Sequence, residues 1–116
     1  MSRRILVTGA SGLLGGAVAG LLAGQGHSVR TLQRRPAAAP GLESVSGSIT
    51  DRAAVEAAMA GMDAVVHLAA KVSFTGAWSE FHATNIEGTR NVLAAGRAAG
   101  VRDVVFVSSP SVAHFG

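Results

Sequence analysis

Short apolar runs alternate along the chain with longer segments in which apolar residues recur every three or four positions. The runs RILVT (residues 4–8), AVVHLA (64–69) and DVVFVS (103–108) contain little polar alternation, which is typical of strands buried on both faces of a sheet. SVRTL (28–32) and LESVSG (42–47) are two further, less apolar runs of the same length class. The pattern therefore predicts strands at these five places.

The segments between the runs have the periodicity of helices. In residues 13–23 one stripe is expected through Leu13, Leu14, Ala17, Val18, Leu21 and Leu22, and the following glycines end the helix. A short helix is expected over 52–60, with Thr50 or Asp51 as its N-cap. The longest is predicted over 78–99, with one face formed by Trp78, Phe81, Asn85, Gly88, Val92, Ala95 and Ala99.

This order of strands and helices determines the expected fold class. Strands that alternate with helices run parallel and are joined by right-handed crossovers, so helices cover both faces of the sheet. The prediction is an α/β protein with a doubly wound parallel sheet in three layers, α/β/α. Ligands of such sheets bind beyond the carboxyl ends of the strands, which here means the segments after Thr8, Leu32, Gly47, Ala69 and Val107.

Composition narrows the class further. A chain of 116 residues with 48% hydrophobic and 15% charged residues has the material for one globular domain. The net charge of +3 is spread out except for two arginine pairs, so no nucleic-acid surface is expected. The chain has no cysteine, which excludes disulfides and thiolate metal sites and fits a reducing, cytoplasmic location; no metal site is expected. No apolar stretch approaches the roughly 20 residues of a membrane span.

The stretch VTGASGLLGG places Gly9, Gly12 and Gly15 between the first strand and the first helix. Glycines there allow a tight turn, a close approach of the backbone to a pyrophosphate, and contact between helix and strand. Amides at the start of the helix then face the anion. A glycine turn that binds nothing is the alternative, but the flanking strand, helix and βα repeats favour a Rossmann-type dinucleotide site.

With Thr8 before it, the GxxGxxG spacing resembles the TGxxGxxG of the extended short-chain dehydrogenase/reductases. Four looser matches extend the resemblance over essentially the whole chain. It implies an NAD(P)-binding domain over residues 1–116, in which cofactor contacts at the turn come from Gly9, Ser11, Gly12, Leu13, Leu14 and Gly15.

The end of the second strand bears on the choice of dinucleotide. A carboxylate that would select NAD is expected there, but the chain has Gln33 followed by Arg34 and Arg35. Without the carboxylate a 2′-phosphate is not repelled, and a guanidinium is suited to bind it in bidentate fashion. We therefore expect NADP in preference to NAD; the alternative is that the arginines are solvated surface charges.

Two further matches concern the adenosine and ribose. GSIT (47–50) stands where the resemblance implies Gly-Asp-hydrophobic, so Ser48 replaces the carboxylate that contacts adenine, and Ile49 is expected to pack on the ring. In HLAA the small residues after Leu68, namely Ala69 and Ala70, are expected to let the backbone run beneath the cofactor. Lys71 is either a cofactor contact or an exposed side chain, and His67 is interpreted as a core histidine with satisfied nitrogens.

The remaining matches concern the active site. NIEGTRN (85–91) resembles the N-x-x-G-T element, in which Asn85 is expected to bond backbone near the active site or to be a structural amide. SSPSV (108–112) resembles SSxxV, whose second serine helps to hold the substrate carbonyl or hydroxyl, here Ser109. The tyrosine and lysine that complete such a site are implied on a following helix, and the chain contains no tyrosine.

Two interpretations of the missing tyrosine stay open: a front portion of a longer enzyme, which we favour, or a non-catalytic NAD(P)-binding sensor. The sequence from HLAAKVS to SSPSV looks most like that of the 3β-hydroxysteroid dehydrogenase group and of bacterial 2-alkyl-3-oxoalkanoate reductases. Nucleotide-sugar epimerases and dehydratases share the skeleton and are the alternative. The expected substrate is a small alcohol or ketone, and a homodimer of the longer enzyme is left open.

Overall fold

The computed structural model describes residues 2–8, 13–33, 42–68 and 78–107, apart from the side chains of 13–14, 78–86 and 107. Strands and helices alternate as predicted, and every predicted boundary lies within one residue of the observed one. The elements are β1 (Arg4–Thr8), α1 (Leu13–Gly24), β2 (Ser28–Gln33), β3 (Leu42–Ser46), α2 (Arg52–Met59), β4 (Ala64–Leu68), α3 (Trp78–Ala99) and β5 (Asp103–Val107).

The strands form one parallel sheet in the order β3-β2-β1-β4-β5. Leu6 in the central strand pairs with Arg30 of β2 on one side and with Val65 of β4 on the other. The chain moves outward from β1 to β3 and then crosses back to β4, so the direction of winding reverses between β1 and β4. This reversal confirms the doubly wound, Rossmann-type sheet.

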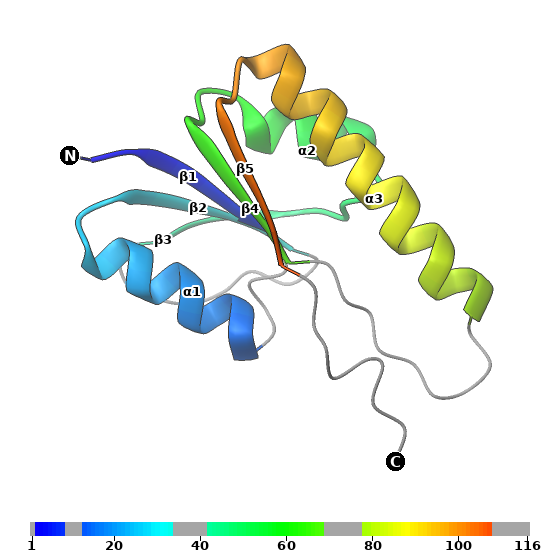
Figure 1. Ribbon diagram of the computed structural model, residues 1–116, viewed down its shortest axis with the longest axis horizontal. Coiled ribbons are helices and arrows are strands. Elements are labelled where there is room, and N and C mark those ends of the chain that lie inside the picture. Colours follow the sequence, from blue (N-terminus) through cyan, green and yellow to red (C-terminus); the bar gives the residue numbers. More distant parts are fainter. Residues whose placement is uncertain (1, 9–12, 34–41, 69–77, 108–116) are drawn as a thin grey trace.

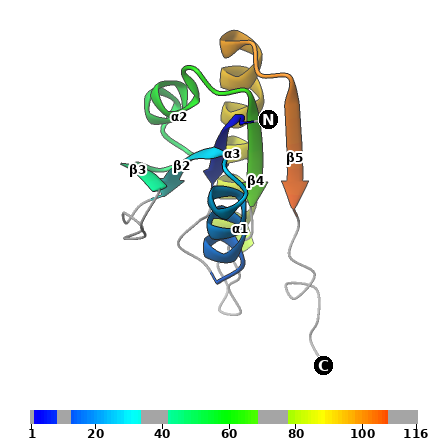
Figure 2. The same ribbon diagram turned by 90° about the vertical axis from the view of Figure 1, so that its left-hand side faces the viewer.

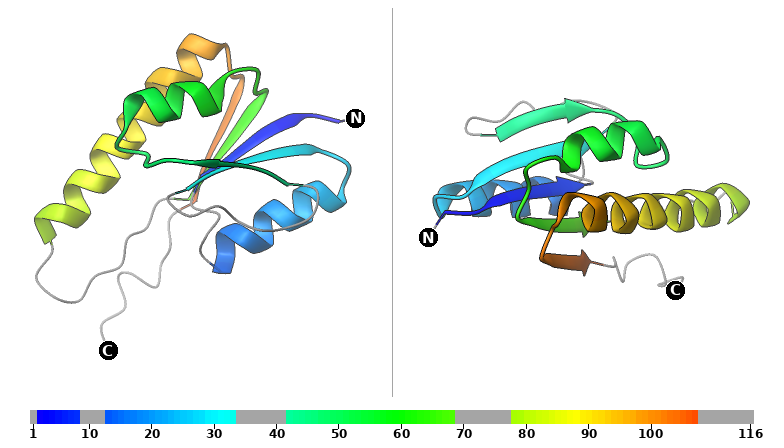
Figure 3. Two further views of the ribbon diagram at one scale, coloured as in Figure 1. Left: turned by 180° about the vertical axis from the view of Figure 1, so that it is seen from behind. Right: turned by 90° about the horizontal axis from the view of Figure 1, so that it is seen from above.

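The helices cover the two faces of the sheet unequally. Figure 3 shows α2 and α3 on one face and α1 on the other, with the sheet between them. The three-layer α/β/α arrangement predicted from the alternation is therefore confirmed. None of the helices in the described ranges has both the length and the apolar character needed to cross a membrane.

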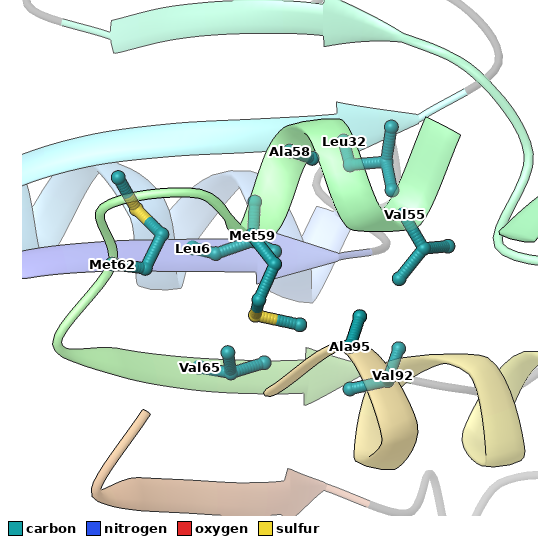
Figure 4. Packing of buried hydrophobic residues seen from close by; sticks show 9 residues of the cluster. All are labelled: Leu6, Leu32, Val55, Ala58, Met59, Met62, Val65, Val92 and Ala95. Carbon is teal, nitrogen blue, oxygen red and sulfur yellow. The ribbon is translucent and has the colours of Figure 1, made fainter. Parts of the chain in front are cut away.

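Each face of the sheet has its own apolar cluster. On the side of α2 and α3, side chains from three strands meet those of both helices (Figure 4): Leu6, Leu32, Val55, Ala58, Met59, Met62, Val65, Val92 and Ala95. On the side of α1 the cluster is smaller and consists of Ile5, Val7, Ala19, Val29 and Ala64. Each fully buried Val or Leu stabilises the fold by about 1.5–3 kcal/mol.

The face that α1 presents to the sheet differs from the predicted stripe. Ala17 and Leu21 are exposed, Leu21 by 63%, whereas Gly15 and Ala19 are buried. The buried positions lie one residue further along, which corresponds to a rotation of about 100° around the helix axis. The helix packs through its smallest residues because they allow its backbone to approach the sheet closely.

The ends of the other two helices refine the predictions. Asp51 is the N-cap of α2, since its Oδ1 accepts hydrogen bonds from the backbone N–H groups of Ala53 and Ala54 at 3.1 and 3.4 Å. Thr50 is therefore not the cap. On α3 the expected face is buried through Gly88, Val92 and Ala95, but Ala99, the last residue of the helix, is exposed.

Candidate functional site

The carboxyl ends of the five strands lie at one edge of the sheet because all strands are parallel (Figure 1). In the described residues this edge contains Thr8 at the end of β1, Gln33 at the end of β2 and Leu68 at the end of β4. The segment 47–50 follows β3 at the same edge. We take this edge as the candidate site, as the sequence predicted.

The glycine turn lies between β1 and α1. Gly9, Ser11 and Gly12 fall outside the described residues, and Leu13 and Leu14 open α1 with side chains that are also outside the description. Gly15 is buried in the first turn of the helix. The first N–H groups of α1 have no partner within the helix, so this helix start is suited to an anion.

Gln33 is the most unusual polar residue of this edge. Its side chain is only 5% exposed, yet neither its amide nitrogen nor its amide oxygen has a hydrogen-bond partner among the described residues. Side chains alternate along a strand, so Gln33 shares with Val29 the face of the sheet that α1 covers. Arg34 and Arg35, the predicted contacts to a 2′-phosphate, lie outside the described residues.

The segment after β3 is held by short-range hydrogen bonds. Ser48 Oγ lies 2.7 Å from Thr50 Oγ1 and accepts a hydrogen bond from the Thr50 N–H at 3.2 Å. Ile49 is half-buried and packs against the cluster beneath α2 and α3. The adenine contacts expected of Ser48 and Ile49 stay predictions.

His67, on β4, contacts residues of three other elements, β1, α3 and β5. Its Nδ1 lies 2.6 Å from Thr8 Oγ1 and its Nε2 lies 3.3 Å from Thr89 Oγ1 on α3, and the ring meets Phe106 edge-on. Burial lowers the pKa of the imidazole to about 4, so the ring is neutral at physiological pH. The interpretation of His67 as a core histidine with both nitrogens satisfied is confirmed.

Several predicted residues are not tested by the structure. Leu68 is half-buried and packs against the cluster beneath α1. Asn85 lies on α3, but its side chain is outside the description, as are Ala69, Ala70, Lys71 and Ser109 altogether. Their roles therefore stay predictions from the resemblance.

The structure also shows polar residues that the sequence did not single out for a role. Thr89 contacts His67, and Asn91 Nδ2 donates a hydrogen bond of 2.8 Å to the Ile49 carbonyl. These partners are 22 and 42 positions apart in the chain. Local periodicity contains no signal for contacts over such distances; only the position of both residues in the NIEGTRN match pointed to this part of α3.

A groove of about 470 Å³ lies at the opposite, amino-terminal edge of the sheet, near Arg4, Arg30 and Glu43. Arg30 donates there to Glu43 Oε1 and to the carbonyls of Ala58 and Ala60, each at 2.9 Å. The Arg30 side chain therefore links β2 to β3 and to the end of α2. The described residues contain no group of three side chains suited to hold a metal ion.

Comparison with known proteins agrees with this fold. The sequence model of the NAD dependent epimerase/dehydratase family matches residues 5–115. The chain is 40% identical over 114 residues to the 2-alkyl-3-oxoalkanoate reductase of Stenotrophomonas maltophilia, a match that covers 96% of this chain and 34% of that protein. It is also 40% identical to a 3 beta-hydroxysteroid dehydrogenase/Delta 5→4-isomerase of Mycobacterium tuberculosis, with 94% and 32% covered.

A solved structure supports the same relationship. A short-chain dehydrogenase/reductase superfamily protein from Agrobacterium tumefaciens, with bound NAD, superimposes with a TM-score of 0.84 at 45% identity. The match covers 91% of this chain and 32% of that one. The chain thus spans about a third of the length of the relatives that it matches.

Proposed function

Because this chain belongs to the NAD dependent epimerase/dehydratase family, we propose that it is the dinucleotide-binding part of an oxidoreductase that interconverts a secondary alcohol and a ketone. The relatives named as a reductase and as a dehydrogenase, each 40% identical, support an oxidoreductase. A small hydrophobic alcohol or ketone is the proposed substrate. The absence of cysteine supports a cytoplasmic location.

The observation that carries the proposal is the buried side-chain amide of Gln33 at the carboxyl end of β2, which has no hydrogen-bond partner among the described residues. A buried amide without hydrogen bonds costs about 1–3 kcal/mol, so a partner is expected outside the described residues, and a bound ligand is one source of it. The ribose of a dinucleotide whose diphosphate lies at the start of α1 offers hydroxyl groups to this strand end. The residues present therefore fit the cofactor.

Within this proposal the chain binds and orients, while the dinucleotide supplies the hydride chemistry when bound. The N–H groups at the start of α1 and the turn Gly9–Gly12 bind the diphosphate, and Gly15 keeps the helix close to the sheet. Ser48 and Ile49 contact the adenine, and Leu68, Ala69 and Ala70 line the ribose and phosphates. Ser109 holds the substrate oxygen; Asn85 bonds backbone beside it, and Lys71 contacts the ribose or phosphates.

We further propose that NADP is preferred to NAD. Gln33 carries no charge that would repel a 2′-phosphate, and Arg34 and Arg35 follow it directly. The solved relative from Agrobacterium tumefaciens holds NAD, so the preference has to be measured on this protein.

The test is a titration of the intact protein with NADPH and with NADH, followed by the fluorescence of the bound nicotinamide. NADPH should bind more tightly, and Arg34→Ala or Arg35→Ala should weaken NADPH binding by about tenfold or more and leave NADH unchanged. Gln33→Asp should reverse the preference, because a carboxylate repels the phosphate and accepts a hydrogen bond from the free 2′-hydroxyl. Tighter binding of NADH, with no effect of either arginine change on NADPH, contradicts the assignment.

Two other activities are separable by experiment. The family description includes epimerases and dehydratases, in which hydride returns to the same molecule and the dinucleotide is not consumed. Net conversion of NADPH to NADP in the presence of a ketone favours the oxidoreductase, whereas turnover without net change in the dinucleotide favours an epimerase or dehydratase. Tight binding without any turnover favours a non-catalytic sensor.

A further inference from the structure

Helix α3 contacts the segment that follows β3 through Ile49. Gly88 and Asn91 lie three positions apart on α3 and therefore share a face of the helix. Gly88 is buried against the Ile49 side chain, and Asn91 Nδ2 donates to the Ile49 carbonyl oxygen at 2.8 Å. The helix thus fixes both the side chain and the backbone of the same loop residue.

The contact with Gly88 leaves no room for any side chain. A Cβ built on Gly88 would lie 2.3 Å from Ile49 Cδ1 and 2.7 Å from Ile49 Cγ1, well inside the normal contact distance. Glycine is unfavourable inside a helix, so its presence here is explained by this close approach. Gly96 on the same helix differs: a Cβ there would meet Val101 at 3.7 Å, which is an ordinary contact.

The rest of the segment is anchored to its own surroundings. The Gly47 N–H donates to the Gln33 carbonyl at 2.9 Å, and a Cβ on Gly47 would lie 2.8 Å from the Ala54 Cβ. The Asp51 N–H donates to the Ser48 carbonyl at 3.0 Å. Between these anchors, Ile49 is the residue whose position depends on α3.

We propose that Gly88 and Asn91 are positioning residues for the adenine end of the dinucleotide. They hold Ile49 at the carboxyl ends of the strands and so place it, next to Ser48, where the adenine is expected. This inference rests on the proposed function, because it assumes that the adenine lies against this segment. Loss of either contact displaces Ile49, so the adenine half of the cofactor should bind more weakly and the nicotinamide half should not.

The test compares the two halves of the cofactor as separate probes. AMP, nicotinamide mononucleotide and NADPH are titrated calorimetrically into the intact protein and its variants. Gly88→Ala introduces the clash, and Asn91→Asp replaces the donating amide by an acceptor that faces the Ile49 carbonyl. Gly96→Ala is the matched control, since it makes the same change on the same helix at a position where the added Cβ meets its neighbours at ordinary contact distance.

We expect Gly88→Ala and Asn91→Asp each to weaken AMP and NADPH by about tenfold, with nicotinamide mononucleotide unchanged. Gly96→Ala should bind all three probes like the wild type. A double-mutant cycle separates positioning from general damage. In an Ile49→Ala background the two shortest contacts, to Cδ1 and Cγ1, are absent and the contact of 3.2 Å to Cβ is left, so Gly88→Ala should weaken AMP by less than it does in the wild-type background.

Equal losses for AMP and nicotinamide mononucleotide, or additive effects of Gly88→Ala and Ile49→Ala, overturn the inference. Wild-type affinity for AMP in both single variants overturns it as well. Circular dichroism identifies a variant that does not fold, in which case Asn91→Asp, a change of one half-buried side chain, decides the question. If the wild-type protein binds none of the three probes, the proposed function itself is wrong, and the two failures are thereby distinguished.

Discussion

At the scale of single residues, His67 makes contacts that require it to be neutral. A neutral imidazole has one N–H donor and one acceptor nitrogen, and each threonine hydroxyl is able to serve as either partner. The contacts with Thr8 and Thr89 therefore satisfy both nitrogens in either tautomer. His67 is only 1% exposed, so protonation of its ring would bury a positive charge. Its hydrogen-bond partners in the described residues include no carboxylate that would balance this charge.

This predicts a dependence of stability on pH. Burial lowers the pKa of His67 to about 4, below the ordinary value of 6.5, so the unfolded state binds a proton at a higher pH than the folded state does. The stabilisation is complete above pH 6.5, and about 3 kcal/mol of it is lost as the pH falls to about 4. Urea denaturation at pH 7, 5.5 and 4.5 measures the free energy of unfolding across this range.

The control for this prediction is His67→Gln, which keeps a donor and an acceptor but does not titrate in this range. The difference in unfolding free energy between wild type and variant should be constant above pH 6.5 and should shrink towards pH 4. An identical slope for both proteins over this range shows that other groups cause the pH dependence.

At the scale of elements, α1 shows which face of a largely apolar helix packs on the sheet. Apolar residues lie both on the predicted stripe and on the neighbouring face of small residues, and the periodicity pointed to the stripe with the larger side chains. The sheet is approached by Gly15 and Ala19, while Leu22 and Ala23 flank the contact. The choice follows from packing distance, because small residues bring the helix backbone nearer to β1 and β2.

Substitutions on α1 test this choice. Ala19→Leu places a large side chain in a fully buried position and should lower the free energy of unfolding by about 1–3 kcal/mol. Ala17→Leu, the same change at an exposed position two residues earlier, should alter it by less than about 0.5 kcal/mol. Denaturant titration of both variants checks the pair, and a reversed order of the two effects supports the stripe expected from the sequence.

The same scale shows what the sequence could predict. Strand and helix limits were predictable because glycines, as at Gly24 and Gly100, end the periodic segments, and because buried parallel strands lack polar alternation. The place of Gln33 at a strand end followed from those limits. The contacts of Thr89 with His67 and of Asn91 with Ile49 did not, because they depend on how the crossover between β4 and β5 places α3 over the sheet.

At the scale of the whole molecule, the two outer strands of the sheet, β3 and β5, differ in the side chains that they expose. The β3 edge is polar: Glu43 and Ser46 are exposed, and Glu43 is paired with Arg30. The β5 edge is apolar, with Val105 51% and Phe106 49% exposed (Figure 2 shows β5 at the outer side of β4). These two residues point to opposite faces, so neither face is fully covered at this edge.

An apolar strand at an open edge favours pairing with another chain. We therefore expect residues 1–116, expressed alone, to self-associate with increasing concentration, as measured by light scattering after size exclusion. Val105→Lys should reduce this association, whereas Leu93→Lys, on a 47% exposed position of α3, should not. A monomer at all concentrations, or an equal effect of both lysines, contradicts pairing through β5.

In the longer protein that we propose, Val105→Lys should instead destabilise the fold. The curated relatives are about three times as long as this chain, and we propose that further residues of such a protein cover β5. A lysine buried beneath them without a partner would then lower the melting temperature, because an unpaired charge is costly to remove from water. Leu93→Lys is again the control. If Val105→Lys leaves the melting temperature of the intact protein unchanged, this side chain is exposed there too, and the β5 edge needs no cover from the same chain.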